Sequence, residues 1–547
     1  MPIRKSYPVT SRPAGLSDAF DSTEAFPGAC TSLQNLIFDQ SNPECVISRP
    51  GVGNPVISAS ALAAQIGSGT ATFISLHVVI GSLVYGMVSM SGGTYAGLDV
   101  PFIYNLATAA FVSVTGYTTS NLPASPATSG AWTPPTAAQI GVYLIITHPG
   151  FNGTGTLFFG AINTATNAWT AQNVGTHALP SAPTAVANFF NRAWYAIGNQ
   201  AYYSDSLAPL TATNAGQALT VGDGTPILGF AGLPIATSSG GIVGALIAFK
   251  QAQIWQITGD AALSGNPLSQ NYLSLTQGSS APRSIAQTQT GVFFVGTDGA
   301  MLIDPLGNVN RIRNPQRNVS DIRIPFINAT TPSRIAGGFA TNIYRVCVPT
   351  IIAGTNVTND YWFDTTRSRW NGPHNFVYDC ASQVATYFLV SGIATGANIF
   401  ASYPVPQVSS IYSDNGVAVS VLMTTSDFPK TQNMNLFQIT EGTQEFSSSG
   451  AAVTYSLSMT DSAGNSLALC TVTTSQTGVA WDGGAVWDGG AVWSNTQIAP
   501  AIYQIPWPNP IVANKFILGI SATSSSSLMI GAHRSRYQDA GYVATGG

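Results

Sequence analysis

Three tryptophans recur at an even spacing in the segment GVAWDGGAVWDGGAVWSN (478–495), and an Asp-Gly-Gly follows each of the first two. Trp481, Trp487 and Trp493 could stack on sugar rings, and the interleaved aspartates could contribute to a cation site. A calcium ion needs about six or more oxygen ligands, whereas Asp-Gly is ordinary hairpin-turn chemistry. We therefore expect these tryptophans mainly to fill a sandwich core or a subunit joint, with sugar stacking as the alternative.

A second candidate is the arginine-rich segment NVNRIRNPQRNVSDIRIPF (308–326), which contains a single acid, Asp321. Its arginines are Arg311, Arg313, Arg317 and Arg323. Arg311 and Arg313 alternate, so on a strand they would share one face. The arginines could contact phosphates or dock a subunit, or they could hold a loop to backbone carbonyl groups between sheets. No aromatic residue interleaves with them, which argues against a platform for single-stranded nucleic acid.

Residues suited to catalysis or metal binding are sparse. The five histidines lie in unrelated contexts, and the five cysteines are scattered without a C-x-x-C pair. The sequence contains no G-x-S-x-G, P-loop or dinucleotide-binding motif. A glycosidase needs two carboxylates about 5–10 Å apart, and none of the few acids is set aside for that role. We expect no enzyme, cofactor or metal site, buried free thiols in a reducing compartment, and a turn role for His148 in THPGF.

The composition indicates a surface with very few charges. Charged residues make up 8% of the chain and the net charge is −4, whereas about a quarter of residues are charged in a typical protein. No global field therefore draws the chain to nucleic acid or an anionic membrane. Low charge gives little colloidal repulsion, so we expect a protein that neighbouring subunits cover, with a neutral secreted β-protein as the alternative.

Two segments could be mistaken for membrane or secretion signals. The first residues carry positive charges without a following apolar stretch, so we expect no signal peptide. The apolar run 73–90 contains a histidine, serines and glycines. A pair of strands with a turn at Gly81-Ser82 explains this run better than a transmembrane helix.

Short strand patterns dominate the chain, with runs of β-branched and aromatic residues closed by Gly, Pro, Asn or Asp. Only residues 58–67 favour a short helix, so the fold class is predicted to be all-β. Units recur about every 40 to 50 residues, a period typical of four-stranded propeller blades. The units span 72–115, 140–172, 184–209, 240–260, 283–307 and 334–374. We predict a β-propeller of about six blade-like units over 56–404, with a stack of β-sandwiches as the alternative.

The two ends of the chain differ from this repeat. Residues 1–55 contain many prolines and few strand signals, which predicts an extended N-terminal arm lying on its own domain or on a neighbouring subunit. Residues 405–547 have longer alternating strands and a hairpin in SMTDSAGNSLAL, which predicts a β-sandwich-like C-terminal domain.

The arm sequence LQNLIFDQSNPECVISRPGVG (33–53) and the phrases FFNRAWYAIGNQAYYSD, ALIAFKQAQIWQITG and YWFDTTRSRW resemble a known family. They are similar to the arm and propeller blades of tail nozzle, or hub, proteins of short-tailed bacteriophages, also described as packaged-DNA stabilisation proteins. The resemblance covers most of residues 30–400 as a style of repeat. The C-terminal part is less similar.

The resemblance implies a structural virion protein located in the phage tail and assembled in the host cytoplasm without membrane insertion. Six copies would form a ring or tube below the portal and adaptor proteins, retain packaged DNA, and conduct double-stranded DNA during ejection without binding it tightly. The negative net charge agrees with this role, because every neutralised phosphate adds affinity that would arrest sliding. Arg311, Arg313, Arg317 and Arg323 would then face the lumen or a subunit boundary.

Two other functions fit parts of the same pattern. A carbohydrate-binding propeller at a cell surface, or in a receptor-binding role, would use its tryptophans to stack on sugars. A glycosidase-like propeller enzyme is the second alternative.

Overall fold

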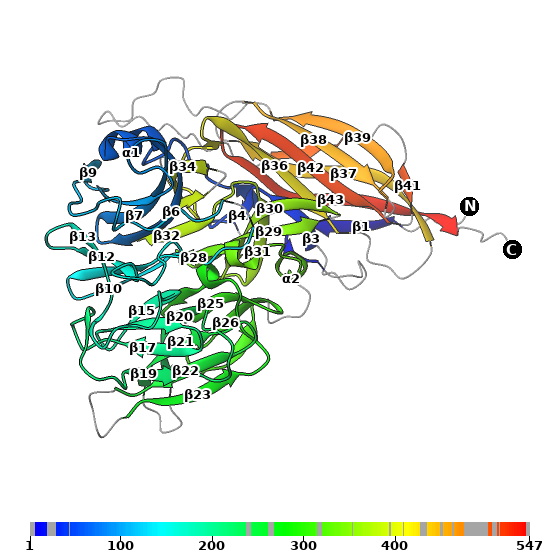
Figure 1. Ribbon diagram of the computed structural model, residues 1–547. Helices are drawn as coiled ribbons and strands as arrows, with labels where there is room; N and C mark the ends of the chain where they lie inside the picture. The colour runs from blue at the N-terminus through cyan, green and yellow to red at the C-terminus, as the bar shows by residue number, and fades with distance from the viewer. Residues whose placement is uncertain are drawn as a thin grey trace, which may run out of the picture.

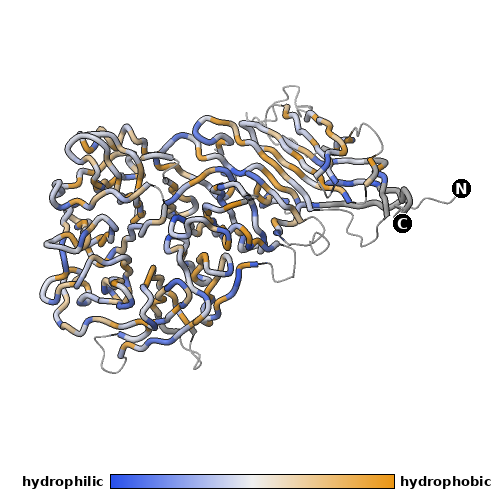
Figure 2. The backbone as a smooth tube through the Cα atoms, turned by 45° about the vertical axis from the view of Figure 1, so that its right-hand side comes forward, coloured by the Kyte–Doolittle hydropathy of each residue, from blue (hydrophilic) through white to orange (hydrophobic). Residues whose placement is uncertain are grey.

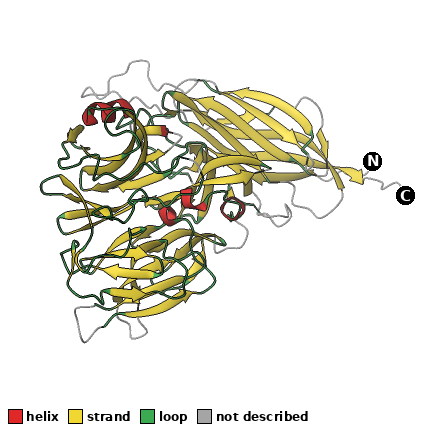
Figure 3. Ribbon diagram, in the orientation of Figure 1, coloured by secondary structure: helices red, strands yellow, loops and turns green. Residues whose placement is uncertain are grey.

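The computed structural model describes residues 6–18, 29–42, 44–128, 130–236, 242–260, 267–313, 320–352, 354–392, 395–407, 410–426, 435–448, 452–461, 464–474, 501–505, 511–513 and 515–542. Strands dominate this part of the chain, with two short α-helices, α1 (Ala59–Ile66) and α2 (Ile324–Ile327), which confirms the all-β prediction (Figure 3). In these residues, no helix is long and apolar enough to cross a membrane.

Six small antiparallel sheets and four strands of an 11-stranded sheet follow one another along residues 70–402 and form the seven blades of a propeller (Figure 1). Blade one consists of β6 (Thr70–Ile80), β7 (Leu83–Ser91), β8 (Asp99–Asn105) and β9 (Ala110–Val112), and blade two of β10 (Thr136–Ile140), β11 (Tyr143–Thr147), β12 (Phe159–Asn163) and β13 (Ala168–Gln172). Blade three consists of β15 (Ala185–Phe189), β16 (Arg192–Ile197), β17 (Gln200–Tyr203) and β19 (Ala218–Thr220). Blade four consists of β20 (Gly229–Ala236), β21 (Ile242–Phe249), β22 (Ile254–Thr258) and β23 (Ser269–Ser274). The short pair β14 (Gly175–Thr176) and β18 (Thr211–Ala212) lies outside these sheets.

Blades five to seven complete the ring. They consist of β24 (Ala286–Thr288), β25 (Gly291–Gly296), β26 (Gly299–Ile303) and β27 (Val309–Arg311); β28 (Ala336–Ala340), β29 (Ile343–Ile352), β30 (Thr355–Asp364) and β31 (Arg369–His374); and β32 (Cys380–Val384), β33 (Tyr387–Gly392) and β34 (Gly396–Ser402). The first strands of blades two to seven contact one another in turn, and β32 packs against β6 of blade one. The ring is therefore closed without a covalent link.

The seventh blade is one more than the sequence repeat suggested. It has three strands of its own, and an isolated bridge between Ile57 and Ile399 adds a residue from before blade one. Ile399 donates a hydrogen bond to the Ile57 carbonyl at 2.9 Å. Because part of this blade comes from a distant segment, its own stretch of sequence lacks the four-strand period.

The segments predicted from local patterns lie where expected. The apolar run 73–90 forms β6 and β7, which are joined at Gly81 with a φ of 60°. The predicted helix is α1, whose first turn is capped by Ser58: its Oγ accepts a hydrogen bond from the backbone N–H of Ala61 at 3.2 Å. Gly67 ends the helix in the left-handed conformation, which favours glycine.

The remaining strands form a two-sheet sandwich beside the propeller (Figure 1). One sheet has the order β4 (Leu36–Phe38), β5 (Val46–Ser48), β43 (Leu528–Tyr542), β37 (Asn435–Ser448) and β40 (Ala501–Gln504), with β1 (Ser6–Ser11) on β43 and β41 (Ile511–Ala513) on β37. The other has the order β3 (Ala29–Gln34), β36 (Val417–Thr425), β42 (Ile517–Ser524), β38 (Thr454–Thr460) and β39 (Ser466–Thr473), with β2 (Gly15–Leu16) on β3 and β35 (Ser413–Asp414) on β36.

The N-terminal segment is built into this sandwich. The sequence predicted few strands in residues 1–55, but five strands lie there, and β1, β3 and β5 pair with strands from the other end of the chain. In Figure 1 the blue N-terminal strands lie among the red and orange C-terminal ones. The local sequence gives little signal for β1, β3 and β5, because each of these strands pairs with a segment hundreds of residues away.

Strand pairing joins the two parts of the molecule. Leu33 of β3 is paired with Gly372 of β31, so blade six and one sandwich sheet form a continuous 11-stranded sheet. One hydrophobic core also runs across the boundary and includes Leu33, Trp370 and Phe446, all fully buried. Figure 2 shows hydrophobic residues recurring along the sandwich strands. The propeller and sandwich are therefore expected to move as one body.

Candidate functional site

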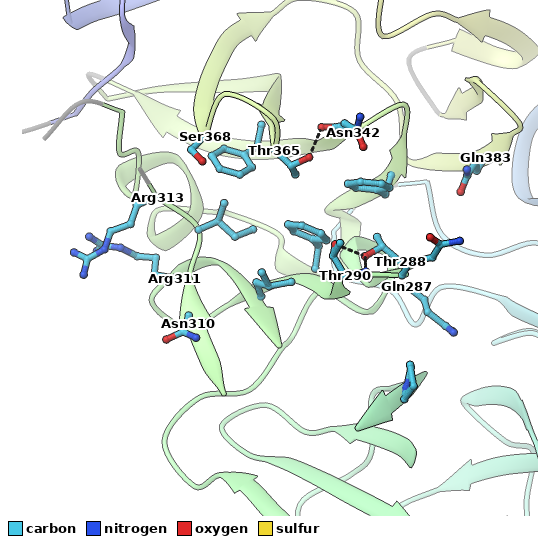
Figure 4. Close-up of a pocket in the computed structure, with 17 residues that line it drawn as sticks. Gln287, Thr288, Thr290, Asn310, Arg311, Arg313, Asn342, Thr365, Ser368 and Gln383 are labelled. Carbon is cyan, nitrogen blue, oxygen red and sulfur yellow. Dashed lines mark hydrogen bonds between the residues drawn. The ribbon is translucent and has the colours of Figure 1, made fainter. Parts of the chain in front are cut away.

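A pocket of about 1070 Å³ opens where blades five, six and seven meet on one face of the propeller (Figure 4). Gln289 and Thr290 come from the β24–β25 turn, Asn342 from the β28–β29 turn, and Ser368 from the β30–β31 turn. These turns gather on one face because antiparallel strands reverse direction at each step, so the first–second and third–fourth connections leave the same side.

The polar side chains of the pocket are mostly amides and hydroxyls. Figure 4 labels Gln287, Thr288, Thr290, Asn310, Arg311, Arg313, Asn342, Thr365, Ser368 and Gln383. Among the described residues that line it, there is no Asp, Glu, His, Cys or Lys. A guanidinium stays charged at neutral pH and cannot exchange a proton there, so the lining has no general acid or base. The polar side chains of the pocket are suited to hydrogen bonding.

The apolar part of the pocket is held in place by stacked rings. Phe293 of β25 and Phe339 of β28 stack at 5.4 Å between ring centres with 16° between their planes. Phe293 also stacks on Tyr344 at 5.0 Å. These rings belong to the core shared by blades five and six, so they fix the pocket wall and leave recognition to the polar side chains.

The predicted arginine segment lies beside this pocket, but its members do not act as one surface. Arg311, on β27, donates a hydrogen bond to Asp321 at 2.5 Å, and Arg323 pairs with Asp298. Arg313 follows the end of β27, is exposed and lines the pocket. Arg317 lies outside the described residues. The strand ends at Arg311, so the expected alternation of Arg311 and Arg313 on one strand face is not formed.

The same segment also holds the N-terminal arm. The Asp18 carboxylate accepts hydrogen bonds from the backbone N–H groups of Arg323 and Ile324, each at 2.5 Å, and Ser320 donates one to the Leu16 carbonyl at 3.0 Å. Burial raises the pKa of Asp321, and the charge of Arg311 partly offsets that rise. The side chains of Arg311 and Arg323 pair with the carboxylates of Asp321 and Asp298. Contacts of these arginines to backbone carbonyl groups, to phosphates or to another subunit stay predictions.

Trp481, Trp487 and Trp493 lie outside the described residues, so their role as core or joint residues, or as a sugar platform, stays a prediction.

Blade six contains a buried network of charged and polar side chains. Arg345 and Asp360 form an ion pair with about 1% of each side chain exposed. Asp360 also accepts hydrogen bonds from Trp362 Nε1 at 2.6 Å and Tyr378 Oη at 2.8 Å, and Arg345 donates to Ser402 at 2.8 Å. The Asp360 carboxylate is therefore held by three side chains of the same blade region.

A second buried carboxylate joins blades one and two. Asp99 accepts hydrogen bonds from Ser75, from Ser89 at 2.5 Å and from His148 Nε2 at 2.9 Å. His148 Nδ1 accepts from the backbone N–H of Gly150 at 3.0 Å, so the ring bears its proton on Nε2. The sequence predicts a turn role for His148, and the Phe151 N–H does donate to its carbonyl at 3.1 Å. His148 is also a buried link between blades, which only the fold could reveal.

The axis of the propeller is occupied by residues that sequence reasoning missed. Trp132 lies in the connection between blades one and two, and the guanidinium carbons of Arg283 and Arg334 each lie 4.7 Å from its ring centre. Arg283 precedes blade five and Arg334 precedes blade six. The similar sequences PRS (282–284) and PSR (332–334) both form 3-10 turns. This similarity is the local signal that could have pointed to the two arginines.

Across the described part of the chain, no three His, Cys, Asp or Glu side chains gather closely enough to hold a metal ion. The five cysteines are free thiols, and four of them are buried.

Comparisons with known proteins give no family for this chain. No protein-family model matches it, and no curated protein matches it. Among solved structures, the CNH domain of AfRom2 matches with 8% identity and a TM-score of 0.29, over 52% of this chain and 87% of that one. An exo-β-1,3-galactanase from Phanerochaete chrysosporium with galactose matches with 8% identity and a TM-score of 0.20, over 86% of this chain and 95% of that one.

Proposed function

We propose that this chain is a non-catalytic structural subunit of a phage tail, a nozzle or hub protein that assembles into a ring, most simply a homohexamer, below the portal and adaptor. In this proposal the ring retains packaged DNA and conducts it during ejection. The family is suggested by the sequence resemblance of the arm and the blades. The role in assembly is supported by the surface of the sandwich.

Four neighbouring strands of the sandwich, β36, β42, β38 and β39, contain no charged residue at all. Their outer face bears hydroxyl ladders, such as Ser420 with Thr523 and Thr454 with Thr473, each pair 2.9 Å apart. A shallow groove of about 690 Å³ runs over this face. We name these four strands the hydroxyl sheet.

The hydroxyl sheet is suited to being covered by a neighbour. Burying hydroxyl groups costs far less than burying charges, and such groups can exchange water for partner hydrogen bonds. Leu469, on the edge strand β39, is 66% exposed. Among the described strands β39 pairs only with β38, and an uncharged edge strand is a template for pairing with another chain. Both features favour association of copies of this chain.

The rest of the molecule is compatible with this role. The pocket of Figure 4 lacks a general acid or base, and the buried carboxylates Asp99 and Asp360 are engaged in structural contacts. The 11-stranded sheet makes the subunit a stiff building block. Low charge and a net charge of −4 suit a passage through which DNA slides without strong binding.

The test is assembly. The purified full-length chain, alone and mixed with a portal–adaptor complex, is imaged by electron microscopy and weighed by native mass spectrometry. Rings that add to the portal complex are the expected result. A chain that stays monomeric in both mixtures, at concentrations well above those in an infected cell, would refute the proposal.

Carbohydrate binding is the second candidate, and the pocket of Figure 4 favours it. Amide and hydroxyl side chains around a rigid aromatic wall match the hydroxyl groups of a saccharide. Titration of the soluble chain with oligosaccharides released from host lipopolysaccharide tests this function. Saturable binding that Gln383→Ala and Asn342→Ala each weaken would support it, and heat signals equal to those of buffer would exclude it.

A further inference from the structure

The propeller axis holds two positive charges in a place shielded from solvent. Arg334 and Trp132 are each 8% exposed, and Arg283 is half-buried. Both guanidinium groups lie over the same indole ring, at 4.7 Å from its centre. Cation–π contacts of this kind are stabilising, but they do not neutralise the charge.

The hydrogen bonds of these arginines go to neutral backbone carbonyl groups. Arg334 donates to the carbonyls of Gly130 at 2.7 Å and Ala127 at 2.6 Å. Arg283 donates to the carbonyl of Asp379 at 2.9 Å and also to that of Ser75. These bonds connect the segments that lead into blades two, five, six and seven with β6 of blade one. They fix the side chains but supply no negative charge.

Among the described residues, two N–H donors at this point have no hydrogen-bond partner. They are Nε1 of Trp132 and Nη1 of Arg334, and both atoms are buried. Buried N–H groups without an acceptor are rare in folded proteins, because each one loses the hydrogen bond that it made to water. Two such donors on contacting side chains point to an acceptor that is not part of the chain.

The local charges favour an anion over water as that acceptor. Burial lowers the pKa of both Arg283 and Arg334, and Asp379 is the one carboxylate whose charge opposes this lowering in both. Two guanidinium groups facing one carboxylate leave an excess positive charge. The Cys380 thiol is the other titrating group: burial raises its pKa, but His77 and Arg283 bring it down to about 7. Below that pH the thiol is neutral and the excess remains.

We propose that the propeller axis binds a small inorganic anion, chloride in the cell, which accepts hydrogen bonds from Trp132 Nε1 and Arg334 Nη1. The bound anion ties the connection before blade two to the start of blade six, so it strengthens a ring that has no covalent closure. This inference does not depend on the proposed tail function.

The experiment is a thermal unfolding series on the full-length chain at pH 6, where the Cys380 thiol is mostly protonated. Sodium chloride is compared with sodium gluconate at equal ionic strength, because gluconate is too large for a shielded site. Tm is expected to rise with the logarithm of chloride concentration and to stay flat in gluconate. Equal Tm values in the two salts would overturn the proposal.

Matched variants separate this site from general salt effects. Trp132→Phe keeps the ring and removes the donor, so its Tm is expected to lose the dependence on chloride. Trp169→Phe is the control, since Trp169 Nε1 already donates to the Asn121 carbonyl at 3.1 Å, and its chloride dependence should persist. If Trp132→Phe does not fold, Arg334→Lys provides the same test while keeping the charge.

A direct observation completes the test. Crystals soaked in sodium bromide are expected to give an anomalous density peak within hydrogen-bonding distance of Trp132 Nε1. An ordered water at that position with no anomalous signal would refute anion binding.

Discussion

The propeller and the sandwich are built from strands of the same kind, but they obtain them differently. Blade four is made from consecutive residues between Gly229 and Ser274. The sandwich instead joins strands from both ends of the chain, as where Asn35 donates to the Ser420 carbonyl at 2.7 Å, 385 residues away. The comparison teaches that a repeat can be recognised in the sequence when each unit forms its own sheet. It cannot be recognised when a sheet is assembled from distant segments.

The two regions also differ in how they bury polar groups. Blades one and six contain buried carboxylates with complete sets of partners, Asp99 and Asp360. The hydroxyl sheet of the sandwich has no charge to bury. The propeller therefore depends on specific polar contacts within one chain. The outer face of the hydroxyl sheet has no such charged contacts and could be covered by another chain.

The largest expected effect comes from breaking the ionic network of blade six. Asp360→Asn leaves the Arg345 charge buried without its partner, so the free energy of unfolding should fall by about 3–5 kcal/mol. Guanidinium denaturation of the isolated chain measures this change. The double variant Arg345→Met, Asp360→Leu removes both charges and should recover much of the loss. A single variant as stable as the parent would show that the propeller does not depend on this pair.

The second prediction compares the same substitution in the two regions. Leu33 and Leu246 are both fully buried, so Leu33→Ala and Leu246→Ala should each cost about 2–5 kcal/mol. The region that each substitution destabilises should differ. Leu33 lies in the core that crosses the boundary between propeller and sandwich, while Leu246 packs in a cluster of blades three and four. Hydrogen exchange is expected to rise in both β36 and β31 for Leu33→Ala, and only near β21 for Leu246→Ala. Identical exchange maps would contradict a shared core.

Acid should weaken the sandwich through His533. Burial lowers the pKa of His533 from 6.5 to about 4. Between these values the unfolded chain binds a proton that the folded chain does not, so stability is present above pH 6.5 and is lost as the pH falls toward 4. From pH 7.5 to pH 5 the loss is about 2 kcal/mol. Denaturant titration at the two pH values measures it.

The matched control for this pH effect is His533→Gln, which cannot take up a proton. Its loss of stability between the two pH values should be smaller than that of the parent by the same amount. His374 remains in both proteins and should add its own acid sensitivity, because burial, Arg49 and Arg345 keep its pKa well below 6.5. Parallel pH profiles for parent and variant would exclude His533 as the cause.

The smallest effect on stability concerns the hydroxyl sheet. Ser456→Lys places a charge on an outer face, so unfolding of the monomer should change by less than about 0.5 kcal/mol. Ring assembly should nevertheless weaken, because a neighbour would have to bury the ammonium group. Gln200→Lys, on β17 of blade three, is the matched control. Rings that form equally well from both variants would show that the hydroxyl sheet is not a subunit contact.

Much of the candidate site could not be predicted from sequence. The arginine segment was recognised because charges are so rare in this chain, and Arg311 and Arg313 do line the pocket. Their partners could not be foreseen, since Gln383 and Asn342 belong to other blades and only the ring brings them near. Trp132, Arg283 and Arg334 looked like ordinary loop residues, because their contacts form across the axis and leave no local period.

The sequence by itself determined the strand content, the helix at α1, the hairpin over 73–90 and the blade repeat, because turn chemistry and side-chain alternation act between near neighbours. The low content of charged residues also follows directly from the sequence. Only the tertiary structure decided the seventh blade, the insertion of the arm into the sandwich, the 11-stranded sheet and the charged axis. Each of these depends on backbone or charged groups from distant segments satisfying one another, and such partners are chosen by the folded geometry and not by local pattern.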